Sequence, residues 1–490
     1  MKIDARYVVA LLAVGWQAHA WAQQAPQRAT ALGTPGAGLN APFQSGYVDL
    51  MLGLGYTDNA LLAGSRHKGD GIGTAGFSVD YLREGRFSLN LLGNLDRVEY
   101  LHHSFSGSFY GHFLGSALLG TSANVLQWQL QEAFGEGMTD PLASPTPQNL
   151  QTVNNVATGP MVNLHFGLTN RLTFSGLYSR TTFQRSPYDS QTYLGGAQFV
   201  HALSGAASLS FAASTAHTKY IDSAAVQSFF RGASSTFDIR QASVSYSAHF
   251  VRTRVLLRAG YNSLHYAGGS THGSPLYALR ISRRISPFST VFLGAEEAYS
   301  TNGGSLASPG AQIGLQTGAS LNAGIAVAQP FNMRSAQAGW MFQRARTNLS
   351  VTGSYMQETF DQTSAINAYN NRTEGAMVAI GRQLRPTVMV QLRLQGYLER
   401  YSNLGAQTHR YIAQLTFSKH FARTTFWIYA ERSHQSGAPG ISTFLAASYS
   451  DDQVGVYVTY DLFGERPAGS NLVGMPSVGM PSLGGFGSGY

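Results

Sequence analysis

The sequence predicts an all-β fold, a closed antiparallel transmembrane β-barrel of about 20 strands, with about 18 strands as the alternative. Three observations support this prediction. Apolar and polar residues alternate with a period of two, the alternating stretches are long, and short and long connections follow one another along the chain. Charged residues make up only 12% of the chain, about half of the roughly 25% found in soluble domains. Strands with one apolar face and one neutral-polar face account for such a composition.

The alternation is clear in residues 125–131, where Leu126, Trp128 and Leu130 share one face and three glutamines share the other. Residues 241–250 and 388–399 follow the same pattern, and helical spacing fits none of these stretches. About ten residues suffice for a tilted strand to cross the hydrocarbon layer of a membrane. Several apolar faces end in an aromatic residue, as an interfacial girdle requires; examples are Tyr178, Tyr261 and Tyr411.

The connections between these stretches alternate in length. Very short ones are predicted near residues 84–85, 121–122, 169–170, 204–205, 251–252, 286–287, 345–346, 385–386 and 422–423. Longer ones are expected between them, for example residues 132–156, 220–236, 300–333, 360–372 and 433–450. Outer-membrane barrels have short periplasmic turns and longer external loops. The predicted location is therefore the bacterial outer membrane, with both termini in the periplasm.

The N-terminus has the layout of a secretory signal peptide. Lys2 and Arg6 precede the apolar residues 7–16, and small residues follow at alternate positions up to Ala22. This is the charged, apolar and A-x-A order of an export signal. We predict a signal peptide over residues 1–22, with cleavage between Ala22 and Gln23.

The rest of the chain divides by composition. Residues 23–44 are rich in Ala, Gly and Pro, which predicts a flexible periplasmic lead-in. Residues 45–463 form the predicted barrel. Residues 464–490 are rich in Gly, Ser, Pro and Met and are predicted to be disordered, with a docking peptide as the alternative.

Several functional classes are excluded or disfavoured by composition and motifs. No apolar run of about 18 residues follows the N-terminal segment, which argues against a helical membrane protein, and cysteine is absent. The 14 histidines lack metal-site spacing, and no G-x-S-x-G element stands out. Dense Lys/Arg clusters typical of nucleic-acid binders are missing. We therefore expect no catalytic residue, no metal, no cofactor and no nucleic-acid partner, so the chain is not predicted to be an enzyme.

The arginines are the most informative polar residues. Arg254 and Arg258 lie opposite Val255 and Leu257 on an alternating stretch, so they are expected to point into the lumen. Arg280, Arg393 and Arg410 lie on polar faces as well. A further set lies beside the predicted short turns: Arg252, Arg283, Arg284, Arg344, Arg346, Arg382, Arg385 and Arg423. One hypothesis is a basic periplasmic mouth that concentrates anionic solutes or polymer. The other is contact with lipid headgroups, together with internal ion pairs.

The last predicted strand, residues 453–463, is similar to the C-terminal signal read by the bacterial barrel-assembly machinery. The matching residues are Gln453, Gly455, Val458 and Tyr460. In most such barrels an aromatic residue ends the chain, whereas here residues 464–490 follow.

Short segments of the body also resemble a known family. They are Gly55–Asn59, pieces of residues 132–160, Ser186–Ser190 and Tyr449–Asp452. On these segments the chain resembles the beta-barrel porin 2 family, and most of all its exopolysaccharide-locus and exosortase-associated members. The resemblance covers roughly residues 47–463. It implies an outer-membrane barrel encoded beside genes for polysaccharide synthesis and secretion, without catalytic residues.

Three functions remain open at this point. The first is an outer-membrane channel that assists exopolysaccharide export, and the second is a general diffusion porin with anion preference. The third is a structural or adhesive surface barrel with a closed lumen. The expected partners are outer-membrane lipid, the barrel-assembly machinery, a polysaccharide and periplasmic secretion proteins.

Overall fold

The computed structural model describes residues 44–65, 67–83, 87–120, 125–140, 143–229, 234–301, 329–361, 369–438 and 448–462. The predicted signal peptide with its cleavage site at Ala22 and Gln23, the lead-in up to residue 43 and the tail of residues 464–490 lie outside these residues. The same holds for the predicted turns at residues 84–85 and 121–122.

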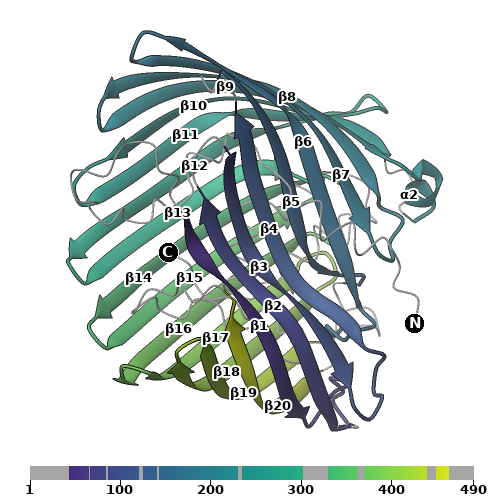
Figure 1. Ribbon diagram of the computed structural model, residues 1–490. Coiled ribbons are helices and arrows are strands. Elements are labelled where there is room, and N and C mark those ends of the chain that lie inside the picture. The colour runs from purple at the N-terminus through teal and green to yellow at the C-terminus, as the bar shows by residue number, and fades with distance from the viewer. Residues whose placement is uncertain are drawn as a thin grey trace.

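The described residues form one 20-stranded sheet, in which each strand pairs antiparallel with the next and β20 pairs with β1 (Figure 1). The predicted all-β fold and the closed barrel are thus confirmed, with 20 strands rather than the alternative 18. The strands are β1 (Gln44–Thr57), β2 (Asp70–Arg83), β3 (Phe87–Tyr100), β4 (Ser108–Gly120), β5 (Leu126–Met138), β6 (Leu150–Phe166), β7 (Asn170–Phe183), β8 (Ser190–Ser204), β9 (Ala207–Tyr220), β10 (Thr236–His249), β11 (Thr253–Tyr266), β12 (Thr271–Ser286), β13 (Ser289–Ser300), β14 (Phe331–Arg344), β15 (Thr347–Thr359), β16 (Asn371–Arg385), β17 (Val388–Tyr401), β18 (Ala406–Phe421), β19 (Thr424–Ala438) and β20 (Tyr449–Asp461).

Closure of the sheet follows from the pairing of β1 with β20. The register runs from Asp49 opposite Asp461 to Thr57 opposite Gln453. A closed sheet leaves no strand edge with unpaired backbone N–H and C=O groups, which hydrocarbon could not satisfy. This arrangement is therefore the one in which such a sheet can cross a lipid bilayer.

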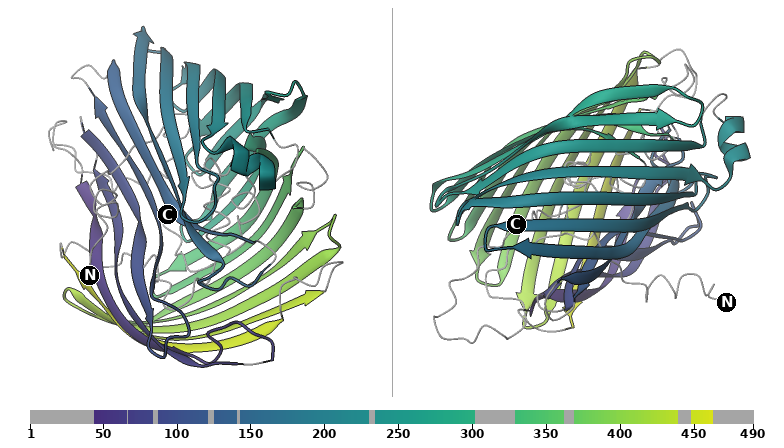
Figure 2. Two further views of the ribbon diagram at one scale, coloured as in Figure 1. Left: turned by 90° about the vertical axis from the view of Figure 1, so that its right-hand side faces the viewer. Right: turned by 90° about the horizontal axis from the view of Figure 1, so that it is seen from above.

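The two ends of the barrel differ in their connections. At one end, here called the short-turn end, the hairpins between β8 and β19 are closed by only two or three residues, as between Ser204 and Ala207. The other, the long-loop end, carries longer connections and the helix α2 (Ser223–Phe229), which lies beyond the strand ends (Figure 2). The start of β1 and the end of β20 both lie at the short-turn end.

The outward face of the barrel is apolar. Large, highly exposed hydrophobic side chains occupy every second position along the strands. Examples by exposed fraction are Leu52 at 67%, Tyr261 at 59% and Leu257 at 44%. The intervening side chains point inward and are mostly polar. The inversion of the usual inside-outside order of a soluble protein identifies the wall as the lipid-facing surface of a transmembrane barrel.

The apolar band has the thickness of a membrane. On β14, the outward residues Arg334 and Arg344 are separated by about ten residues, which measure about 34 Å along the strand at about 3.4 Å each. A tilt of about 45° reduces this length to about 24 Å across the membrane, close to the height of about 25 Å typical of such bands. The outward side chains between the two arginines are Ala336, Ala338, Trp340 and Phe342.

One predicted connection is largely strand. Residues 132–156 were expected to form a long loop, but β5 continues to Met138 and β6 begins at Leu150. Here the apolar Val153 faces inward and is fully buried, while the neighbouring Asn154 faces outward. This part of the wall lies beyond the lipid band, so the apolar-outward pattern stops and the strand cannot be recognised by it. For the same reason β19 extends to Ala438, inside the predicted loop of residues 433–450.

Candidate functional site

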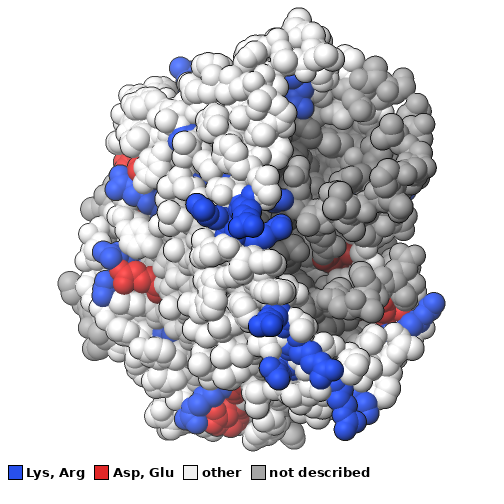
Figure 3. Space-filling view, turned by 90° about the vertical axis from the view of Figure 1, so that its left-hand side faces the viewer, with Lys and Arg blue, Asp and Glu red and all other residues white. Residues whose placement is uncertain are grey.

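The short-turn end is strongly basic. Arg252, Arg346 and Arg423 lie in its turns, and Arg344 and Arg385 end their strands there. The turn segments themselves contain no Asp or Glu; they are residues 241–258, 279–294, 340–352, 380–393 and 415–428, while Asp461 on the neighbouring β20 lies beside Arg423. In Figure 1 this end lies on the left, opposite α2, and Figure 3 views it face on, with Lys and Arg in several groups and fewer acidic side chains. The end therefore presents a positive field to solutes that approach it.

The alternation of the strands divides the predicted arginines into two groups. Arg254 and Arg258 lie opposite the exposed Leu257 and Tyr261 and face the lumen, as expected. Arg283, in contrast, shares its face with the exposed Ile285 and points outward. Arg280, Arg284, Arg393 and Arg410 face inward, whereas Arg344 and Arg382 face outward. The predicted mouth thus combines a lumen-facing group with a group on the outer rim.

One inward arginine is held by an ion pair. Arg280 lies 3.0 Å from the carboxylate of Glu296 across the β12–β13 pair. Glu296 is in turn aligned through Ala278 with Arg258, because the three occupy one row across β11, β12 and β13. Arg258 and Arg280 thus both lie near Glu296 on the inward face of this part of the wall.

A second polar row crosses another part of the wall. Arg393, Gln414, Glu431 and Gln453 are consecutive partners on β17, β18, β19 and β20. Gln414 Nε2 donates to Glu431 Oε2 at 3.0 Å. Arg393 and Glu431 are both buried, so this row is a structural network in the wall rather than an accessible cation.

At the long-loop end, inward side chains pack against the loops. Tyr220, Phe237, Tyr266 and Phe331 are buried in one cluster with Val226 of α2 and the loop residue Tyr188, and the partly buried Tyr369 packs against it. Burial is the main cause that raises the pKa of Tyr188 to about 12, and Tyr369 contributes, so the phenol stays neutral at physiological pH. This aromatic packing narrows the lumen at the long-loop end.

The seam between β12 and β13 opens near the long-loop end. Their pairing ends at Tyr277 opposite Glu297, although β12 continues to Thr271 beside β11 and β13 continues to Ser300 beside β14. Pro275, which has no N–H to donate, lies in the part of β12 that no longer pairs with β13.

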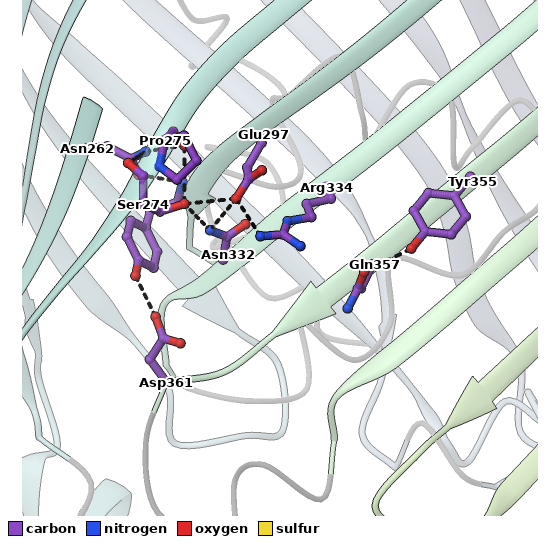
Figure 4. A network of polar contacts seen from close by, with 10 residues as sticks. Asn262, Ser274, Pro275, Glu297, Asn332, Arg334, Tyr355, Gln357 and Asp361 are labelled. Atoms are coloured by element: carbon purple, nitrogen blue, oxygen red, sulfur yellow. Dashed lines mark hydrogen bonds and ion pairs between the residues drawn. The ribbon is translucent and has the colours of Figure 1, made fainter. Parts of the chain in front are cut away.

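Side chains close this opening, as Figure 4 shows. Asn262 Nδ2 donates to the carbonyl oxygens of Ser274 and Pro275, both at 3.0 Å, and Asn262 Oδ1 accepts from the backbone N–H of Tyr299 at 3.0 Å. Glu297, only 3% exposed, accepts from Ser274 Oγ at 2.9 Å and from Asn332 Nδ2 at 3.1 Å. Arg334 completes the network at 3.0 Å from Glu297. The polar network replaces the missing ladder bonds of the wall.

No sequence pattern predicted this network. The available signal was Pro275, because a proline inside an alternating stretch marks an interruption of the ladder. The side chains that bond across the interruption come from β11, β13 and β14, and their spacing in the sequence does not predict that they meet.

The residues of the predicted assembly signal lie on β20, next to the closing pair. Gly455 is opposite Gly55, and Tyr460 is opposite Leu50. Val458 and Tyr460 share the face of the exposed Val454 and Val456, whereas Gln453 and Gly455 face inward. Recognition by the assembly machinery stays a prediction.

The described residues contain no group of three or more His, Asp or Glu side chains placed to hold a metal ion. Among the helices of the described part of the chain, none is long and apolar enough to cross a membrane.

Comparison with known proteins returned structural similarities only. No protein-family profile matches the chain. No curated protein matches it either. The siderophore receptor PirA from Acinetobacter baumannii is 10% identical with a TM-score of 0.45, covering 85% of this chain and 81% of that one. The FrpB iron transporter from Neisseria meningitidis is 8% identical with a TM-score of 0.42, covering 84% and 81%. OccK2 (OpdF) from Pseudomonas aeruginosa, in complex with glucuronate, is 12% identical with a TM-score of 0.39, covering 85% and 98%. The fold assignment rests on the strand register of this chain itself.

Proposed function

We propose that this protein is an outer-membrane channel that assists the export of an anionic exopolysaccharide, with its short-turn end in the periplasm. The observation that supports the proposal is the basic short-turn end, whose lumen-facing side carries Arg254, Arg258 and Arg284 while the surrounding turn segments lack carboxylates. A cationic entrance raises the local concentration of a polyanion and lowers its barrier to entry. The resemblance to the porin 2 family supports the choice of a polysaccharide.

The first test is genetic. Deletion of the gene is expected to reduce the surface polysaccharide of the producing strain, and the wild-type gene is expected to restore it. A strain that expresses the Arg254→Gln/Arg258→Gln variant should restore it only in part. A normal polysaccharide level in the deletion strain would contradict the proposal.

The second test is electrical. In planar bilayers under a salt gradient, the wild-type protein is expected to conduct ions with a preference for anions. The Arg254→Gln/Arg258→Gln variant should shift the reversal potential toward the cation side, because two lumen-facing charges are removed. An unchanged reversal potential in the variant would show that these arginines do not line the conduction path.

Two alternative functions are each favoured by a specific observation. A general diffusion porin with anion preference would use the same inward arginines, and growth of the deletion strain on small anionic solutes would then be impaired. A structural or adhesive surface barrel is favoured by the packed aromatic cluster at the long-loop end. Absence of any conductance, with normal solute uptake, would favour this last function.

A further inference from the structure

The outer rim of the short-turn end carries cations that face away from the lumen. Arg283, Arg344, Arg382 and Lys419 each share a face with exposed apolar side chains of their own strand; on β16, Arg382 lies between Ile380 and Leu384. These side chains therefore lie at the edge of the lipid band rather than in the mouth.

Two of these cations flank a hydroxyl group on neighbouring strands. Arg344 is paired with Thr347, and Thr347 is paired with Arg382, so the three side chains form one outward row across β14, β15 and β16. Arg382 Nη1 donates to Thr347 Oγ1 at 2.8 Å. Strands lie about 4.8 Å apart, so the backbone positions of the two arginines are about 10 Å apart. An anionic oxygen between them can be reached from both sides.

Aromatic residues lie beside this row on its membrane side. The guanidinium carbon of Arg344 lies 5.5 Å from the ring centroid of Phe288, which is exposed. Trp340 and Phe342 follow on the outward face of β14, with ring centroids 6.1 Å apart. Such rings contact the upper part of lipid acyl chains at a membrane interface.

The same combination recurs around the rim. Lys419 lies 4.7 Å from the ring centroid of Phe421, and Arg83 lies 5.8 Å from that of Phe87. Both phenylalanines are exposed. An outward cation beside an exposed aromatic ring at the short-turn end is thus a repeated feature of this edge of the band.

The opposite edge of the band has a different charge pattern. There several outward arginines have carboxylate partners: Arg334 with Glu297, Arg372 with Glu374 and Arg432 with Asp452. Around Arg344 and Arg382 the described turn segments contain no carboxylate. The charge of the short-turn rim is therefore available to an external anion.

We propose that Arg344, Thr347 and Arg382 form a binding site for the phosphodiester headgroup of an anionic phospholipid. The guanidinium groups and the hydroxyl contact the phosphate, because guanidinium is a strong donor to phosphate oxygens. The acyl chains lie against Trp340 and Phe342. The site selects the lipid leaflet at the short-turn end, independently of what passes through the lumen.

The test measures retained lipid by native mass spectrometry. The full-length protein is reconstituted in nanodiscs with equal amounts of phosphatidylglycerol and phosphatidylcholine and then released. The wild type is expected to retain phosphatidylglycerol over phosphatidylcholine by about threefold or more, given the attraction of each interfacial Lys or Arg to anionic lipid. The Arg344→Gln/Arg382→Gln variant should approach equal retention, and Arg344→Lys/Arg382→Lys should keep a preference.

The matched control removes two lumen-facing charges at the same end. Arg254→Gln/Arg284→Gln should alter anion selectivity and leave the lipid preference at the wild-type value. Equal loss in both glutamine variants would overturn the proposal, because net charge alone would then explain retention. Unchanged retention in Arg344→Gln/Arg382→Gln would overturn it as well. Displacement of phosphatidylglycerol by excess inorganic phosphate would identify a site for the free anion instead.

Discussion

At the residue scale, glycines on the inner wall make room for aromatic rings beside the closing pair. The Cε1 atom of Tyr429 would lie only 2.3 Å from a Cβ atom added to Gly455, and Tyr457 Cβ would lie 2.9 Å from one added to Gly53. Trp427 and Tyr457 stack in the same cluster, with centroids 5.5 Å apart. The glycine of the predicted assembly signal thus has a packing role in the folded wall.

Substitution of Gly455 is expected to destabilise the barrel. Gly455→Ala should lower the free energy of unfolding in lipid vesicles by about 1–3 kcal/mol, because the new methyl group displaces the Tyr429 ring. Urea unfolding followed by tryptophan fluorescence measures the change. Gly195→Ala on β8 is the control, since nothing lies within 4 Å of the added Cβ atom. Equal effects of the two substitutions would contradict this account.

At the element scale, the network at the β12–β13 seam replaces backbone pairing with side chains. Asn262 bonds to the carbonyl oxygens of Ser274 and Pro275 and to the N–H group of Tyr299 at the interrupted seam. Buried polar groups without a partner cost about 1–3 kcal/mol each. Asn262 is therefore a main contributor to the order of this stretch of wall.

Removal of that amide should loosen the seam locally. Asn262→Ala is expected to increase hydrogen exchange at the Tyr299 N–H by about tenfold or more, because about 1.4 kcal/mol corresponds to a tenfold change. Exchange in β5 and β6 should stay the same. As a control, Asn163→Ala on β6 removes an amide that bonds to the side chains of Gln127 and Thr173. Wild-type exchange at Tyr299 in the Asn262 variant would show that the network is dispensable.

At the scale of the whole molecule, the wall separates two environments. Ala338 lies on the lipid side of β14 between the two charged edges of the band, and its neighbour Gln337 faces the lumen. A charge is costly only on the lipid side, because the lumen offers polar groups and water. The position on the strand thus decides the effect of a substitution more than the residue type does.

The pair Ala338→Arg and Gln337→Arg tests this orientation. Ala338→Arg should reduce the free energy of unfolding in a bilayer by about 2–4 kcal/mol, as expected near the midplane of a lipid-facing band. Gln337→Arg should change it by less than about 1 kcal/mol. Comparable losses in both variants would argue that the band does not face lipid. Denaturant titration in vesicles gives both values.

Much of this molecule could be predicted from local pattern. The alternation in residues 125–131 places Leu126 and Trp128 on the lipid side and Gln129 inside, as the structure has them. The same alternation indicates that Arg254 and Arg258 face the lumen. It also indicates that Arg283, which lies between Ile281 and Ile285 on alternate positions, faces outward. Residues 132–156 were wrongly expected to be a loop because the strand extends beyond the lipid, where its outward side chains become polar.

The sequence by itself determined the strand period, the closed all-β architecture and the basic character of the short-turn end, because lipid imposes a strict two-residue alternation on every crossing segment. Only the tertiary structure decided which side chains meet across strands. Glu297, Ser274 and Asn332 converge at an interrupted seam, and Arg344 and Arg382 flank Thr347 on the outer rim. These neighbours are set by the register of long-range pairing, and register depends on contacts that no local pattern contains.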